Sequence, residues 1–114
     1  MEGKHLIIDS EGTRSPSVLD SVEYIYRFLE EIPKLTGMEV LIPPHVVRCH
    51  DHGNEGVTGV VVITTSHSSI HTWPNSGVIK FDLYSCKDFD AEFIIGEFKR
   101  RFKPESMKAQ VIPG

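Results

Sequence analysis

The sequence has few cysteines and no long apolar run, and these two absences exclude several classes of protein. Its 114 residues include two cysteines, Cys49 and Cys86, which is too few for the disulfide framework of a small secreted domain. No apolar run approaches the ~20 residues that a helix needs to span a bilayer. The N-terminus is not followed by an apolar segment long enough for a signal peptide. We therefore expect a cytoplasmic protein that does not associate with a membrane.

The chain also lacks any excess of positive charge. Twelve Lys and Arg residues stand against 16 Asp and Glu residues, so the formal net charge is −4. This balance offers no general electrostatic attraction to nucleic acid. The length of 114 residues and the 39% of hydrophobic residues are typical of a single globular domain, residues 1–114, with a modest core.

Two segments have the periodicity of amphipathic helices. The first is expected to open at Pro16 or Ser17 and to end or kink at Pro33, which lacks the N–H of the helical ladder. The second can be capped by Asp88 or Asp90. Apolar residues recur at steps of three and four in both segments, which places them on one face of each helix: Val18, Leu19, Val22, Ile25, Tyr26, Leu29 and Ile32 in the first, and Phe93, Ile94, Phe98 and Phe102 in the second.

Six segments have the alternation or the β-branched content of strands. The order βαββββαβ, with short links between the middle strands, predicts an α+β two-layer sandwich, in which an antiparallel sheet carries two helices on one face. A partner subunit could cover the second face of such a sheet. The expected strands are residues 5–9, 39–49 with an interruption at Pro43-Pro44, 57–64, 67–73, 78–85 and 108–112.

The most unusual composition lies in residues 64–73, which contain three serines, three threonines, two histidines and the only tryptophan of the chain. Hydroxyl groups beside imidazoles are the material of nucleophile-and-base chemistry. Ser66 is a candidate nucleophile with His67 or His71 as its base. Alternatively, these are polar residues at the end of a strand, and His71 is a core histidine. Trp73 could pack at an edge or form a platform for a planar ligand.

Cys86 and a cluster of histidine, cysteine and aspartate residues at 45–52 are two further candidates for chemical function. Cys86 follows the last middle strand, where a buried and inert thiol is the ordinary interpretation. Histidine, cysteine and aspartate could together bind a metal ion, but their spacing here matches no standard zinc signature, and adjacent residues on a strand point to opposite sides. We therefore expect no metal site at this cluster: His45, Cys49, His50, Asp51 and His52.

Four segments follow one another at a specific spacing: Gly56–Ile63, Ser66-His67, Ile70–Pro74 and Phe81–Cys86. Together they resemble the prokaryotic S-adenosylmethionine decarboxylase family, whose members depend on a pyruvoyl group, and the spacing matches the family pattern without gaps. The core Ser-His-x-x-Ile-His-Thr-Trp-Pro is far more specific than any isolated Ser/His pair. The similarity extends over nearly the whole chain, and it is weakest at residues 10–17 and 33–55.

The resemblance implies that the chain cleaves itself between residues 65 and 66 and converts Ser66 into the pyruvoyl cofactor. His71 and Thr58 would assist this processing, although the family has serine where Thr58 stands. The mature enzyme would be a homodimer with active sites built from both subunits. It would decarboxylate S-adenosylmethionine for spermidine synthesis. Cys86 would protonate the α-carbon after carbon dioxide leaves, and Trp73 would stack on the adenine.

Three positions depart from the family pattern. Thr65 stands where the family has glutamate immediately before the cleaved serine. Asn75 replaces a glutamate that holds the ribose hydroxyls, so charge-assisted hydrogen bonds are replaced by weaker neutral ones. His52 occupies the position of a second aromatic residue that stacks on adenine. These departures leave two alternatives open: a pyruvoyl-dependent decarboxylase of another amino acid, such as ornithine or arginine, or an uncleaved paralogue without catalytic activity.

Overall fold

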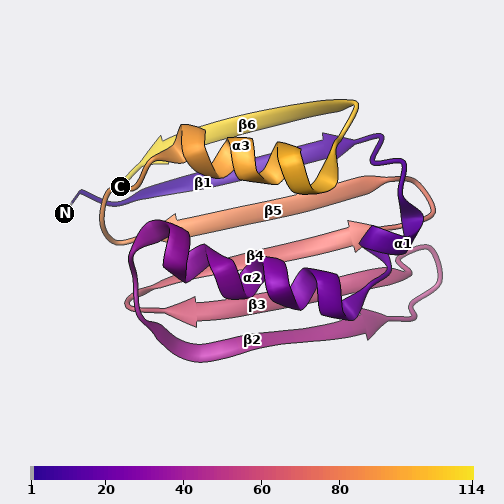
Figure 1. The fold of residues 1–114 in the computed structure, drawn as a ribbon, viewed down its shortest axis with the longest axis horizontal. Coiled ribbons are helices and arrows are strands. Elements are labelled where there is room, and N and C mark those ends of the chain that lie inside the picture. Colours follow the sequence, from indigo (N-terminus) through magenta and orange to yellow (C-terminus); the bar gives the residue numbers. More distant parts are fainter. Residues whose placement is uncertain (1) are drawn as a thin grey trace.

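The computed structural model describes residues 2–114, and Met1 lies outside the described residues. Within this range, six strands form one antiparallel sheet in the order β2-β3-β4-β5-β1-β6. Helices α2 and α3 cover the same face of the sheet (Figure 1), so the predicted α+β two-layer fold is confirmed. The elements are β1 (Lys4–Glu11), α1 (Pro16–Leu19), α2 (Val22–Thr36), β2 (Val40–Cys49), β3 (Gly56–Ile63), β4 (Ser66–Trp73), β5 (Val78–Ser85), α3 (Ala91–Phe102) and β6 (Ser106–Pro113).

The first predicted helix is divided into two, so residues 2–114 contain three helices instead of the expected two. The division occurs because the Ser21 side chain accepts a 3.0 Å hydrogen bond from the Tyr24 N–H and thereby caps the start of α2. Pro33 does not end α2, which continues for one more turn. Gly37, in the left-handed region at φ 70°, closes that turn by donating its N–H to the Pro33 carbonyl.

Aromatic rings hold the helices on the sheet. The Phe102 ring centroid lies 5.0 Å from that of Phe28 on α2 and 5.0 Å from that of Phe98 on α3, and Phe28 also meets Phe81 of β5 at 5.5 Å. Burying each Phe side chain contributes about 1.5–3 kcal/mol, which exceeds the ~1 kcal/mol of a helix cap. Packing against the sheet therefore determines where these helices lie. None of the helices in the described chain combines the length and apolarity needed to cross a bilayer.

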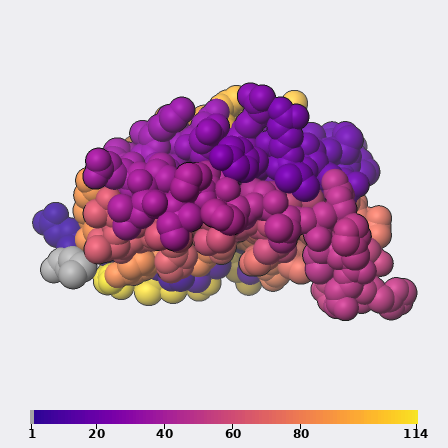
Figure 2. Space-filling model, turned by 90° about the horizontal axis from the view of Figure 1, so that it is seen from below, coloured from indigo at the N-terminus to yellow at the C-terminus, as the bar shows by residue number. Residues whose placement is uncertain are grey.

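None of the helices in residues 2–114 covers the opposite face of the sheet (Figure 1). On β5, the buried residues Ile79, Phe81 and Leu83 point toward the helices, and the alternating residues Lys80 and Asp82 therefore point away from them. Figure 2 shows the loop between β2 and β3, residues 50–55, projecting beyond the body of the molecule on the side away from the helices. All six residues of this loop are exposed.

Candidate active site

Ser66 and Cys86 meet at one end of the sheet. Ser66 begins β4 and Cys86 directly follows β5. The backbone N–H of Cys86 donates a 2.9 Å hydrogen bond to Ser66 Oγ, and Ser66 is only 6% exposed. The structure thus brings the predicted nucleophile and the predicted proton donor together, because the end of β5 lies beside the β3–β4 turn (Figure 1).

The turn between β3 and β4 surrounds the Cys86 thiol. The Sγ atom of Cys86 donates a 3.5 Å hydrogen bond to the carbonyl oxygen of Thr64. Hydrogen bonding by the Thr65 side chain, and next by Ser66, lowers the pKa of the Cys86 thiol from its ordinary value of 9.0, against the opposing effect of desolvation. Cys86 is therefore a stronger acid than an isolated cysteine, and the reading of an inert buried thiol does not fit it.

Thr58 and His71 form a second pair, on the face without helices. Thr58 Oγ1 lies 3.1 Å from His71 Nδ1, because the two residues are direct partners in the β3–β4 register. His71 is five residues from Ser66 along β4. Because side chains alternate between the faces of a strand, an odd separation places these two on opposite faces of the sheet, and five residues span about 16 Å along the strand. Within one chain, the structure does not bring His71 to Ser66.

The predicted substrate-binding residues lie at the other end of the sheet. Trp73 ends β4, and its indole N–H donates a 3.2 Å hydrogen bond to the side chain of Asn54 in the β2–β3 loop. His52 is exposed in the same loop. Thr72 anchors this end of β4 to the helical layer by donating a 2.6 Å hydrogen bond from its hydroxyl to the Leu19 carbonyl.

Asn75 opens onto a cleft of about 310 Å³ at this end of the molecule. Two of the residues around it, Glu55 and Asp20, carry carboxylates, and Asp20 is already paired with Arg48. A carboxylate is therefore present beside the position where the family pattern has glutamate and this chain has an amide. The lining residues are Pro16, Ser17, Asp20, Glu55, Pro74 and Asn75.

A polar network on the face without helices was not predicted from the sequence. Asp82 accepts hydrogen bonds from His5, at 2.8 Å, and from the Ser69 hydroxyl, and the His67 ring lies over Tyr84 with the centroids 5.8 Å apart. The signal that could have revealed this network is the strand order. Ser69 pairs with Asp82, and His5 with Tyr84, only when β1 and β4 flank β5.

The three histidines of the segment around β2, His45, His50 and His52, are all exposed. Among the described residues, no three His, Cys, Asp or Glu side chains gather closely enough to hold a metal ion. His45 instead hydrogen-bonds the Pro43 carbonyl at 2.9 Å.

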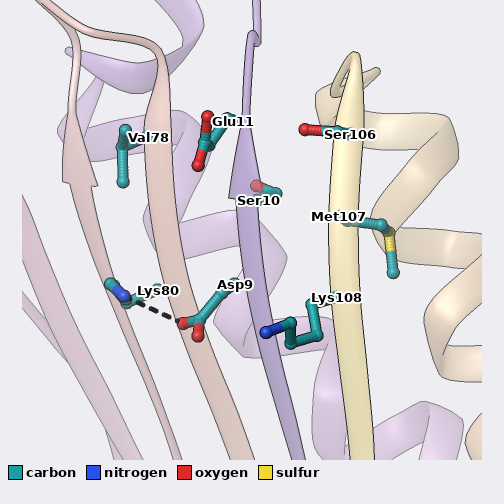
Figure 3. Close-up of a pocket in the computed structure, with 8 residues that line it drawn as sticks. All are labelled: Asp9, Ser10, Glu11, Val78, Lys80, Ser106, Met107 and Lys108. Carbon is teal, nitrogen blue, oxygen red and sulfur yellow. Dashed lines mark ion pairs between the residues drawn. The ribbon is translucent and has the colours of Figure 1, made fainter.

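A hollow of about 360 Å³ lies across β5, β1 and β6, and it contains none of the predicted site residues. Its charges are balanced, since Asp9 forms a 3.2 Å ion pair with Lys80, and Glu11 and Lys108 lie nearby (Figure 3). This hollow therefore offers no net charge to a ligand, and the candidate active site lies elsewhere.

The chain matches the family model described as S-adenosylmethionine decarboxylase over residues 4–113. It belongs to the S-adenosylmethionine decarboxylase family. Proteins named S-adenosylmethionine decarboxylase proenzyme are similar over most of its length. The protein of Methanococcus maripaludis is 34% identical, with 96% of this chain and 87% of the relative covered. That of Archaeoglobus fulgidus is 31% identical, with 96% and 95% covered.

The fold is shared with the crystal structure of the adenosylmethionine decarboxylase from Aquifex aeolicus. That structure superposes with a TM-score of 0.81 at 30% identity, and the match covers 96% of this chain and 88% of the other. The resemblance inferred from the Ser66-His67 and Ile70–Pro74 segments is therefore confirmed. Within this S-adenosylmethionine decarboxylase fold, the candidate site residues form two groups at opposite ends of one sheet.

Proposed function

We propose that the chain is a pyruvoyl-dependent S-adenosylmethionine decarboxylase that cleaves itself between Thr65 and Ser66. The observation that carries this proposal is the hydrogen bond from the Cys86 N–H to Ser66 Oγ, in a chain of this family. It joins the residue that would become the cofactor to the residue that would deliver the proton. The product, decarboxylated S-adenosylmethionine, would serve spermidine synthesis.

Ser66 supplies the hydroxyl from which a pyruvoyl group would form, and the Cys86 N–H hydrogen-bonds that hydroxyl. Ser66 Oγ attacks the carbonyl carbon of Thr65, the peptide C–N bond breaks, and the hydroxyl proton passes to the freed Ser66 nitrogen, which leaves an ester. Loss of the Ser66 α-proton then breaks the Cβ–Oγ bond and releases Thr65 as a carboxylate. Residue 66 is then dehydroalanine, and water hydrolyses its imine form to the keto group of a pyruvoyl, with release of the nitrogen as ammonia. The resulting pyruvoyl carbonyl would supply an electron sink for decarboxylation, as pyridoxal phosphate does in other enzymes.

Cys86 is suited to hold the proton that the substrate carbon receives. Its Sγ lies within hydrogen-bond distance of the Thr64 carbonyl, next to the cleavage position. The lowered pKa of this thiol makes it a better acid at neutral pH than an unperturbed cysteine. A thiol that is half-buried beside Ser66 can therefore deliver its proton to a carbon held there.

A homodimer would complete the site. Ser66 and Cys86 lie at one end of β4, while Trp73 lies seven residues along the same strand, about 23 Å away. One chain therefore cannot hold both ends of a single substrate. A second copy, related by two-fold symmetry and packed on the helix-free face, would bring the Trp73 end of one subunit to the Ser66 end of the other. Thr58 and His71, which point out of that face, would then lie in the interface between the two subunits.

The features at the Trp73 end suit an adenosyl group. The indole of Trp73 and the imidazole of His52 offer planar surfaces for a nucleobase. The side-chain amide of Asn75 can hydrogen-bond ribose hydroxyls, and Glu55 adds a carboxylate to the same cleft. The projection of the β2–β3 loop beyond the helix-free face supports a role for this loop in reaching the partner's site.

Release of carbon dioxide from carboxyl-labelled S-adenosylmethionine tests this function directly. We expect the purified protein to release label from S-adenosylmethionine and not from ornithine or arginine at equal concentration. The Trp73→Ala variant should raise KM for S-adenosylmethionine, because the stacking surface is lost. Release from ornithine or arginine alone would contradict the proposed substrate.

A further inference from the structure

Thr65 has a backbone conformation that is unusual for its residue type. Its φ angle is +45°, in the left-handed region, and among residues 2–114 the only other non-glycine residue there is Lys103 at +44°. For a β-branched residue this conformation is an outlier, because the side chain crowds the backbone. Lys103 lies at the C-cap of α3, where left-handed residues are common, whereas Thr65 lies at the proposed cleavage position.

The hairpin forces Thr65 into this conformation. Ile63 pairs with Ser66, so Thr64 and Thr65 alone connect β3 to β4. Two-residue hairpin loops favour turns whose first residue has positive φ, but here only the second does. Both neighbours of Thr65 are anchored: the Thr64 N–H donates to the Glu39 carbonyl at 3.0 Å, and Ser66 Oγ accepts from the Cys86 N–H.

We propose that the left-handed conformation of Thr65 accelerates self-cleavage of the Thr65–Ser66 bond, which makes Thr65 a positioning residue for that step. This inference rests on the proposed self-cleavage. When Ser66 Oγ attacks the Thr65 carbonyl, the C–N bond breaks and the Oγ proton moves to the Ser66 nitrogen. The ester path through Oγ and Cβ is one atom longer than the peptide path through nitrogen. The longer path relaxes the turn, so strain in the intact peptide is released as the reaction proceeds.

Variants of Thr65 separate strain from the chemistry of its side chain. Thr65→Gly removes the strain, since glycine adopts positive φ freely, and we expect cleavage to slow by roughly tenfold, equivalent to about 1.4 kcal/mol. Thr65→Val keeps the β-branch and removes the hydroxyl, and it should cleave at nearly the parent rate. Lys103→Gly relaxes the other left-handed residue, far from the site, and should leave the cleavage rate unchanged.

The measurement is the time course of cleavage after cell-free synthesis, followed by gel electrophoresis. Melting temperature is measured on the uncleaved Ser66→Ala chain with and without Thr65→Gly. We expect Thr65→Gly to raise the melting temperature while it slows cleavage, a combination that a merely structural role would not produce. Asn also tolerates positive φ, so Thr65→Asn should cleave slowly as well. If the glycine variant misfolds, the cleavage rate of Thr65→Asn still tests the role of strain.

Two results would overturn the inference. If Thr65→Gly and Thr65→Asn cleave as fast as the parent, strain does not drive the step, while the proposed function stands. If Thr65→Val alone is slow, the hydroxyl acts in place of the strain. A parent chain that never cleaves would overturn both this inference and the proposed function, so the two failures are distinguishable.

Discussion

The Cys86 backbone N–H lies 2.9 Å from Ser66 Oγ, although the two residues are 20 positions apart in the sequence. This contact connects the end of β5 to the start of β4 and fixes the Ser66 hydroxyl at the β3–β4 turn. The Thr58–His71 pair and Trp73 lie away from it, on the other face and at the other end of the sheet. The division of the site into two groups suggests different experiments for each.

Replacing Ser66 by alanine should leave a folded, uncleaved and inactive chain, because the attacking hydroxyl is gone. The measurement is gel electrophoresis together with carbon dioxide release. Ser68→Ala is the matched control, since Ser68 is also a buried serine of β4 on the same face, and its hydroxyl donates a 2.8 Å hydrogen bond to the Asp82 carbonyl. That variant should lose about 1 kcal/mol of stability and still cleave. Full activity in Ser66→Ala would exclude pyruvoyl catalysis.

Cys86→Ala should slow decarboxylation far more than cleavage, because the thiol is proposed to protonate the substrate carbon and not to start the cleavage. General acid catalysis typically contributes a factor of ~10²–10⁴, so turnover of the cleaved protein should fall by about that amount. Cys49→Ala, the other cysteine, serves as the control and should be unaffected. Equal turnover in Cys86→Ala and the parent would remove Cys86 from the mechanism.

The reactivity of Cys86 should depend on pH in a way that reports its lowered pKa. Alkylation requires the thiolate, so its rate should reach half of its maximum below pH 9.0, the ordinary pKa of the thiol. Thr65→Val removes the hydrogen bond that contributes most to the lowered pKa, and should move this midpoint to higher pH. The experiment uses iodoacetamide on Ser66→Ala, Cys49→Ser chains, which stay uncleaved and contain a single thiol; because this background also lacks the Ser66 hydrogen bond, the comparison with and without Thr65→Val isolates the contribution of Thr65. An unchanged midpoint would show that Thr65 does not influence Cys86.

Two impaired variants should regain activity at low S-adenosylmethionine concentration when they share a dimer. In a dimer of one Cys86→Ala subunit and one Trp73→Ala subunit, one site contains both substitutions and the other contains neither. Random pairing after co-expression should therefore restore roughly a quarter of the parent activity. Each variant expressed alone is the control. Absence of any recovery in isolated mixed dimers would mean that both residues act within one chain.

Much of the fold follows from local patterns. Alternation predicted the strand over residues 78–85, and in the structure its apolar residues Ile79, Phe81 and Leu83 form the buried face under the helices. Of the two expectations for Pro33, an end or a kink of the helix, the end was wrong, because the helix continues for one further turn that Gly37 closes. The helix break at Ser21 was missed because an apolar stripe continues through it, and periodicity does not reveal a cap.

The site was less predictable than the fold. The motif indicated Ser66, His71 and Cys86 together, but strand parity places the His71 side chain on the other face from Ser66. The left-handed conformation of Thr65 depends on the pairing of Ile63 with Ser66 across the turn, and no local pattern specifies that register. The network around Asp82 likewise requires three strands in their correct order.

The intact mass of the purified protein under denaturing conditions tests the central claim most directly. The account predicts two fragments that separate between Thr65 and Ser66, the second beginning with a pyruvoyl group and therefore lacking a free amine. A single chain of 12.8 kDa after long incubation would contradict self-cleavage, and with it the proposal that Ser66 becomes the cofactor.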